Sequence, residues 1–208
     1  MKRMNLQTAV VIALLLCLGA GTLSAYVLLS PRRTWDADPN VIVDNRGLAS
    51  VSDGDLGRTR TRNAITSASA WNGAGSGTVV NATVGSVSGF TLGDGRPMLN
   101  FRDPLGACTG NCLAATFTGY YSQRSNGTWR INDADIVTNS TGFAWASAGE
   151  ACSNEIYVEG VMVHEVGHLL GLAHTSVSGA TMFPSVSFCS NAPATTEADD
   201  ENGINDLY

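Results

Sequence analysis

The sequence predicts an α+β fold, because a run of strands is flanked by two helices instead of alternating with them. Short apolar and β-branched runs are separated by Gly, Asn, Asp and Pro, and they predict strands at about residues 41–43, 79–84, 98–101, 113–121 and 129–137. Apolar residues at helical spacing predict two longer helices, at about residues 52–71 and 155–170. A short helix at about residues 197–208 is expected to close the chain.

The ends of both long helices carry recognisable signals. Ser52 and Asp55 have the spacing of a capping box at the start of the first helix. Ser153 or Asn154 is expected to cap the second helix, and Gly171 suits its exit because glycine readily adopts the left-handed conformation. The second helix also carries a core-facing stripe at spacings of four, four and three residues, formed by Val158, Met162, Val166 and Leu169.

Residues 1–25 have the parts of a secretory signal peptide: a basic start, an apolar run over residues 9–18 and a small-residue exit at Ala25. Cleavage there would leave residues 26–208 as one globular domain. An uncleaved membrane anchor is the alternative, because the apolar stretch reaches Leu29 when its small and polar residues are included. Secretion is therefore the expected location, with the periplasm or a membrane-anchored form as alternatives.

Composition narrows the function classes. The 208 residues are 44% hydrophobic and only 14% charged, which suits a compact domain and excludes an acidic disordered protein. Without residues 1–25, 10 basic and 18 acidic residues remain, a net charge of −8. Because no Lys/Arg cluster stands out, we expect no nucleic-acid partner. We expect a monomer with no stable membrane association once the leader is removed.

Four cysteines follow the leader. Their even number in an exported chain predicts two disulfides, with three connectivities open. One pairing joins Cys108 to Cys112 across a tight loop and Cys152 to Cys189. A zinc or redox role is the alternative, but the Cys-x3-Cys spacing has no histidine nearby.

All three histidines of the protein fall within eleven residues, at His164, His168 and His174. The first two are four positions apart, so on a helix they project from one face, and Gly171 lets the chain turn back to deliver the third. Three protein ligands plus an open position are the usual arrangement of catalytic zinc. Glu165 lies beside the first histidine, where it can act as a general base. A lone histidine is more often an ordinary core residue, but three at ligand spacing predict one Zn²⁺ site.

This stretch resembles the metzincin zinc proteases, whose motif is His-Glu-x-x-His-x-x-Gly-x-x-His followed by a methionine turn. Residues 180–184, Ala-Thr-Met-Phe-Pro, are similar to that turn in the matrixin branch. The resemblance implies that Met182 forms a hydrophobic floor beneath the three imidazoles; taken alone, Met182 would be ordinary core packing. It also implies a mixed, mostly parallel twisted sheet and a small C-terminal subdomain.

Two further segments are similar to matrixins. Residues 199–208 resemble the family's closing helix, with acidic residues before Gly-Ile and a Leu-Tyr end. Residues 113–116 resemble the edge strand that pairs with an extended substrate, so the resemblance implies protein or peptide substrates. The substrate-binding residues implied in this way are Leu113, Ala114, Ala115, Thr116 and Pro184.

Departures from the family pattern limit what the resemblance implies. Thr175 replaces the usual serine, and Val186 stands in place of a wall tyrosine. Because the three histidines are already used, the second, structural zinc site of animal matrix metalloproteases has no ligands here. The Arg-Cys-Gly propeptide switch is also missing, and residues 26–40 are too short for that prodomain, so we expect a minimal catalytic domain similar to bacterial members.

Calcium is a further candidate cofactor. Asp94 lies between two glycines, and Asp133 and Asp135 are two positions apart on a predicted strand, so their oxygens could bind Ca²⁺. Turn and strand-edge residues satisfied by water or backbone are the alternative.

The sequence as a whole predicts a secreted zinc endopeptidase. One alternative is a non-catalytic, zinc-stabilised peptide-binding module. The other is a membrane-tethered processing protease.

Overall fold

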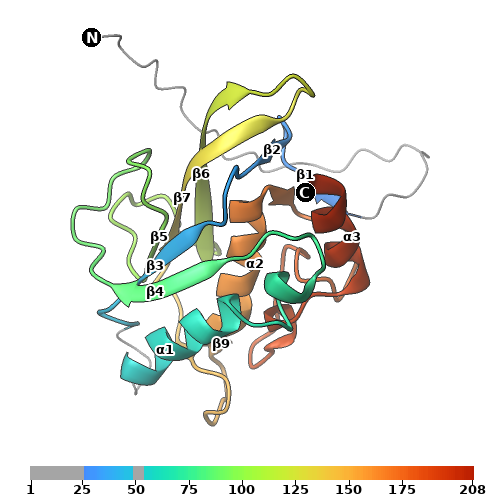
Figure 1. The fold of residues 1–208 in the computed structure, drawn as a ribbon. Coiled ribbons are helices and arrows are strands. Elements are labelled where there is room, and N and C mark those ends of the chain that lie inside the picture. Colours follow the sequence, from blue (N-terminus) through green and yellow to red (C-terminus); the bar gives the residue numbers. More distant parts are fainter. Residues whose placement is uncertain (1–25, 49–53) are drawn as a thin grey trace.

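The computed structural model describes residues 26–48 and 54–208 (Figure 1). The expected leader at residues 1–25 and the capping residue Ser52 lie outside the described residues. In the described part, a mostly parallel sheet packs against two helices, and a third helix closes the chain. The predicted arrangement of several strands between two helices, with a short closing helix, is therefore confirmed at the level of a mixed α/β fold.

The main sheet has six strands. Its order is β2-β7-β5-β3-β4, with β6 paired to β7. The strands are β2 (Arg33–Thr34), β3 (Asn40–Asp44), β4 (Asn81–Gly85), β5 (Met98–Asn100), β6 (Ala114–Gln123) and β7 (Trp129–Thr138). All pairings along this order are parallel, and all five predicted strands are present within two residues of their expected limits.

β6 is the exception to the parallel arrangement. It runs antiparallel to β7, with Thr116 opposite Ile136 and irregularities after Gly119. Within the described part of the chain β6 pairs with no strand other than β7. Its second edge is therefore an unpaired row of backbone donors and acceptors, which can accept an added strand.

The first helix is shorter than predicted. α1 (Gly54–Ile65) ends six residues before the expected limit, and a 3-10 turn, η1 (Trp71–Gly73), follows after a bend. The Thr66 hydroxyl donates to the Arg62 carbonyl, and the Asn72 amide donates to the carbonyls of Thr66 and Val80. A continued helix would pair the Thr66 carbonyl with the Ala70 N–H, but the Asn72 amide binds this carbonyl instead and the Ala70 N–H donates to the Ser67 carbonyl. The chain therefore leaves the helix there.

α2 (Val158–Leu170) carries the predicted stripe, and all four of its residues are fully buried. The predicted cap is wrong. Tyr157 is the N-cap without a side-chain bond, because Ile156 and Tyr157 form strand β9 (Ile156–Tyr157) against β8 (Trp145–Ala146). The Glu155 side chain accepts bonds from the backbone N–H groups of Ser153 and Asn154, so these residues form a turn before the helix.

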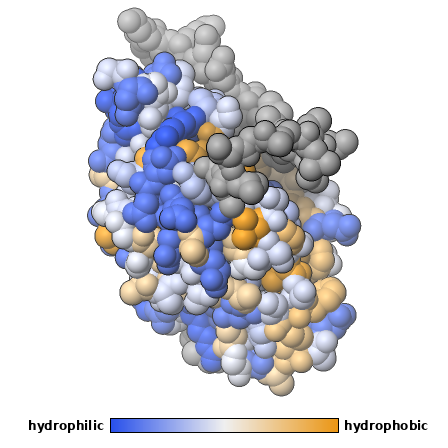
Figure 2. Space-filling view, turned by 90° about the vertical axis from the view of Figure 1, so that its right-hand side faces the viewer, coloured by the Kyte–Doolittle hydropathy of each residue, from blue (hydrophilic) through white to orange (hydrophobic). Residues whose placement is uncertain are grey.

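The core lies between the sheet and α2. Residues from three strands join the α2 stripe in one cluster of buried side chains: Val41, Val43, Leu99, Ala134 and Ile136. Trp71 of η1 belongs to the same cluster. Its indole N–H donates to the Val163 carbonyl of α2 at 2.7 Å. On the outer face shown in Figure 2, hydrophilic and hydrophobic side chains are interspersed.

The segment after α2 returns to the body of the protein. β10 (Leu172–Ala173) pairs with β1 (Val27–Leu28), and a short 3-10 helix, η2 (Ala192–Ala194), precedes the last helix. α3 (Ala198–Leu207) matches the predicted closing helix and begins with a capping box between Glu197 and Asp200. In Figure 1, α3 lies close to β1, and the C-terminus lies beside them.

Both disulfides form in the pairing considered from the sequence. Cys108 is bonded to Cys112, and Cys152 is bonded to Cys189. The second disulfide joins the segment before β9 to the loop after Met182, and the Cys189 N–H also donates to the Glu155 carbonyl. Because all four sulfur atoms are in disulfides, the alternative of a cysteine metal site is wrong.

None of the helices in the described ranges combines the length and the hydropathy that a membrane crossing requires.

Candidate metal centre

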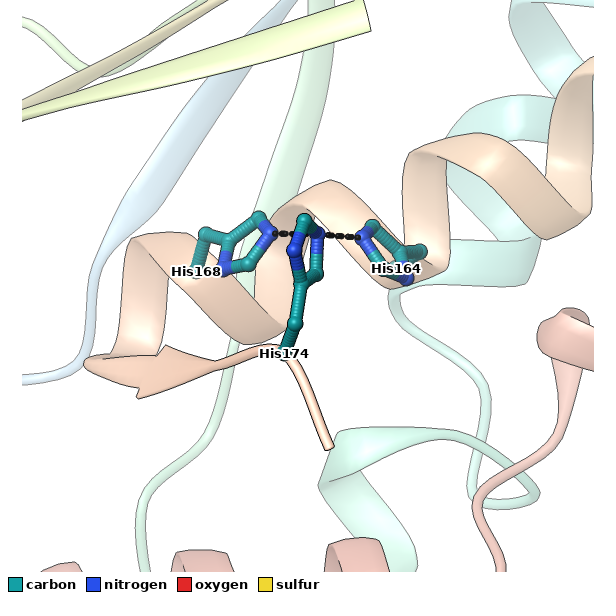
Figure 3. A group of neighbouring side chains, drawn as sticks. All are labelled: His164, His168 and His174. Atoms are coloured by element: carbon teal, nitrogen blue, oxygen red, sulfur yellow. Dashed lines mark hydrogen bonds between the residues drawn. The ribbon is translucent and has the colours of Figure 1, made fainter. Parts of the chain in front are cut away.

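The three histidines meet at one point beside α2 (Figure 3). His164 and His168 lie on the same face of α2, and His174 comes from the segment after β10. The Nε2 atom of His174 lies 3.2 Å from Nε2 of His164 and 3.1 Å from Nε2 of His168. Three nitrogens bound to one tetrahedral ion at about 2.0–2.1 Å are roughly 3.3 Å apart. The spacing therefore suits a single small cation.

Backbone carbonyls orient two of the imidazole rings. Nδ1 of His164 lies 2.6 Å from the Thr181 carbonyl oxygen, and Nδ1 of His168 lies 2.8 Å from that of Leu172. Since a carbonyl only accepts, each Nδ1 carries the proton and each Nε2 keeps its lone pair. This is the tautomer that a metal ligand requires.

A glycine at the end of α2 makes the delivery of His174 possible. Gly171 has φ +113°, and a Cβ atom there would lie 2.4 Å from the Arg33 carbonyl oxygen. Any other residue would be strained and would collide with the backbone of β2. The turn after it is then fixed by the bond from the Thr175 N–H to the Met182 carbonyl, at 3.0 Å.

Glu165 lies within the same turn of α2 as His164 and is 5% exposed. The Thr116 hydroxyl, from β6, donates to Glu165 Oε2 at 2.5 Å. Burial raises the pKa of the Glu165 carboxyl, and the neighbouring His164 and the Thr116 hydrogen bond act in the opposite direction. A raised pKa suits a group that must accept a proton and then release it near neutral pH.

Burial favours the neutral form of His168 and His174. Burial lowers the pKa of His168 well below its usual value, and the charges of His164 and His174 lower it further. Burial, followed by the charge of His164, lowers the pKa of His174 to about 4. Because a lowered pKa favours the neutral imidazole, His168 and His174 keep lone pairs available to a cation.

Met182 is 2% exposed and lies against α2 at Gly167. A Cβ atom added to Gly167 would lie 2.2 Å from the Met182 sulfur, so the missing side chain of Gly167 allows this contact. The Phe183 N–H donates to the Ala180 carbonyl, which closes a tight turn around Met182. Asp200 holds that turn from α3, because its two carboxylate oxygens accept the backbone N–H groups of Thr181 and Met182 at 2.7 and 3.0 Å.

The predicted substrate-binding residues are only partly brought together. Ala114, Ala115 and Thr116 begin β6, which packs against α2, and Leu113 precedes the strand. Pro184 is exposed two residues after Met182, and no hydrogen bond of the described residues links it to β6 or to the histidines.

The candidate calcium residues lie in a different place. Ala134 and Ile136 of β7 belong to the core, so Asp133 and Asp135 point to the opposite face of the sheet. They are 1% and 0% exposed. Each accepts one backbone N–H, from Gly93 and Met98 respectively. Asp133 Oδ1 and Asp135 Oδ2 receive no hydrogen bond from any donor in the described segments.

Ionisation of both carboxyl groups at once is energetically unfavourable, because the pKa of each is raised. Burial raises the pKa of Asp135 to about 8, and the charge of Asp133 contributes in the same direction. Burial also raises the pKa of Asp133. Asp94 adds a third negative charge that acts on both.

Sequence reasoning missed two contacts of the site. It placed Thr116 on the edge strand for its backbone, whereas its side chain contacts Glu165. It noted Asp200 only as part of the closing helix, whereas its carboxylate holds the turn around Met182. Both contacts join elements far apart in the chain, and only the acidic pair at residues 199–200 could have suggested the second.

Comparison with known proteins finds a family profile and several relatives that match this chain. The Matrixin family profile matches residues 99–208, just over half of the chain. Metalloendoproteinase 5-MMP of Arabidopsis thaliana is 49% identical over 51 residues, which are 24% of this chain and 14% of that protein. Metalloendoproteinase 1 of Glycine max is 38% identical over 72 residues, 31% of this chain and 22% of that protein.

Metalloendoproteinase 4-MMP of Arabidopsis thaliana is 41% identical over 59 residues, 28% of this chain and 17% of that protein. The matches therefore span less than a quarter of each of these relatives. The family profile, by contrast, includes the helix with the first two histidines, the third histidine and α3. On this evidence the chain belongs to the matrixin family.

Proposed function

We propose that this protein is a secreted, zinc-dependent endopeptidase. His164, His168 and His174 would hold the zinc ion, and Glu165 would act as the general base. The observation that carries the proposal is the convergence of three histidine Nε2 atoms, with that of His174 at 3.1–3.2 Å from the other two, beside a buried carboxylate. The names of the metalloendoproteinase relatives support the reaction class.

The residues of the site fit such an ion. Two rings are fixed by carbonyls in the ligand tautomer, and all three offer nitrogen, a preferred donor for zinc. A bound zinc ion would lower the pKa of a water molecule and polarise the carbonyl of the peptide bond. Glu165 accepts the proton of the attacking water and later returns it to the leaving amine.

The unpaired edge of β6 supports cleavage within chains. An extended peptide that adds to this edge would be aligned by main-chain hydrogen bonds at residues 113–116. Because this alignment does not require a free chain end, internal peptide bonds are the proposed substrates. Pro184 and Val186 follow the Met182 turn and would border the site on its other side.

The Met182 turn would serve as the floor of the metal site. Its support is the contact of Met182 with α2 at Gly167 and the bond from His164 to the Thr181 carbonyl. This arrangement holds one ligand from behind and leaves the opposite side of the imidazoles for the substrate.

Secretion is proposed from the signal-peptide pattern of residues 1–25 together with two disulfides, which persist mainly in oxidising compartments. A membrane-tethered form would differ in keeping these residues. N-terminal sequencing of the protein released from its host distinguishes the two, because a chain that begins at Tyr26 supports secretion and a retained leader supports the tethered form.

The second candidate function is a zinc-stabilised peptide-binding module. Glu165 argues against it, because a buried base beside three ligands has no role in binding alone. The test is incubation of purified protein with an unbiased peptide library, with and without a chelator, and mass spectrometry of the products. Chelator-sensitive cuts inside the peptides support the protease. Peptide retention without any cut would overturn it.

We also propose that Asp133 and Asp135 bind a calcium ion, with Asp94 close by. The support is the pair of buried oxygens without a donor, because a divalent cation would satisfy both and neutralise both charges. Without a cation the same pair would share a proton. Calorimetric titration of the metal-free protein with Ca²⁺ separates the two states.

A further inference from the structure

The side chain of Thr116 joins the edge strand to the base. Its hydroxyl lies 2.5 Å from Glu165 Oε2 and 3.1 Å from the Glu165 carbonyl oxygen. Thr116 is in β6 and Glu165 is in α2, 49 positions apart in the chain. This is the only hydrogen bond that the described residues donate to the Glu165 carboxylate.

The two carboxylate oxygens of Glu165 differ in their hydrogen bonding. Oε2 is occupied by the Thr116 hydroxyl, whereas no hydrogen bond of the described residues reaches Oε1. A glutamate side chain turns about three bonds, so a single anchored oxygen restricts where the other one can be. The anchor also comes from a strand that is itself fixed, since Thr116 pairs with Ile136 of β7.

We propose that Thr116 is a positioning residue for Glu165. Its hydroxyl holds Oε2, so that Oε1 is presented to the water beside the three histidines. Because the same residue belongs to the strand that would align a peptide, the base is held at a fixed place relative to the substrate. This inference rests on the proposed peptidase function and adds a residue to it.

The expected effect is kinetic. A base that can turn away spends less time within reach of the water, so kcat falls, whereas peptide pairing with the backbone of β6 is unaffected and KM stays the same. Removal of the hydroxyl in Thr116→Val is expected to lower kcat by about tenfold and to change KM by less than about twofold. Zinc content should stay at the wild-type stoichiometry.

Two variants control for shape. Thr116→Ser keeps the hydroxyl and is expected to retain kcat within about threefold. Thr138→Val makes the same change on β7, at a buried threonine whose hydroxyl has no partner among the described residues, and should leave kcat unchanged. A loss of activity in the serine variant equal to that of Thr116→Val would mean that packing, and not the hydroxyl, is responsible, which overturns the inference.

A measurement without metal tests the contact itself. Urea unfolding of chelator-treated wild type, Thr116→Val, Glu165→Ala and the double variant gives a double-mutant cycle. We expect the two substitutions to be non-additive by about fivefold or more in the unfolding equilibrium constant. Additive effects would show that the hydroxyl and the carboxylate do not interact, and would overturn the inference independently of any turnover.

The outcomes separate the two proposals. If the zinc-loaded wild type cleaves no peptide, the peptidase function fails, and the positioning role fails with it even where the cycle shows the contact. If the wild type is active, Glu165→Gln is inert and Thr116→Val works at the wild-type rate, the peptidase function stands and only the role of Thr116 is refuted.

Discussion

The carbonyl oxygen of Thr181 lies 2.6 Å from Nδ1 of His164, so the residue before Met182 fixes the ring of the first histidine. Thr181 is itself held by α3, since its N–H donates to Asp200 Oδ2 at 2.7 Å. A chain of contacts therefore runs from α3 through the turn at Met182 to His164.

Asp200 is predicted to affect zinc affinity although it is not a ligand. In Asp200→Asn, an amide N–H group faces a backbone donor, so at least one of the two bonds to the turn is lost. We expect the zinc Kd to rise about tenfold or more, as for other groups that orient ligands. Competition with a chromogenic chelator measures this. Asp206→Asn, at an exposed aspartate of the same helix, is the control and should leave the Kd unchanged.

Glu165→Gln is predicted to keep zinc and lose turnover. Glutamine has nearly the same shape but cannot accept the proton of the water, so kcat/KM should fall by about a hundredfold or more. Metal analysis and peptide cleavage are measured on the same preparation. Full activity in pure variant protein would refute the role of Glu165.

Gly167→Ala is predicted to disturb the packing of Met182. The new Cβ atom would lie 2.2 Å from the Met182 sulfur and 2.6 Å from Trp71 Cζ2, so the free energy of unfolding should fall by about 1–3 kcal/mol.

Gly160→Ala is the matched control on the same helix, because its nearest contacts are at 3.3 Å or more. The gain in helix propensity offsets that mild crowding, so the control should retain its stability. Equal melting temperatures for the two variants would contradict the close contact at Gly167.

Because of Asp135, the free energy of unfolding of the calcium-free protein is predicted to decrease as the pH rises. Its pKa is raised to about 8 in the folded protein, against about 3.9 in an unfolded chain. Between about pH 4 and pH 8 the folded state therefore binds the extra proton, and stability decreases as pH rises through that range.

Asp135→Asn is expected to flatten this dependence and to be more stable than wild type at pH 8 by about 1 kcal/mol or more. Urea unfolding in chelator from pH 4 to pH 8 provides the measurement. Calcium should restore wild-type stability at pH 8 and have no effect on the variant. A wild-type curve that rises over this range would contradict the assignment.

The sequence by itself determined the periodic and local features. The inward stripe of α2, the five strands and the glycine exit at Gly171 follow from spacing and residue type, because these signals act over a few positions. The convergence of the three histidines could likewise be predicted, since two lie a helical turn apart and the third follows a glycine.

The tertiary structure decided where the helices begin and end and which residues they contact. α1 ends early because Asn72 binds two carbonyls across a bend, and α2 starts late because Ile156 and Tyr157 pair with β8. The bond from Thr116 to Glu165 joins residues 49 positions apart. Such contacts depend on how strands and helices are placed in three dimensions, and no local pattern of residues encodes that placement.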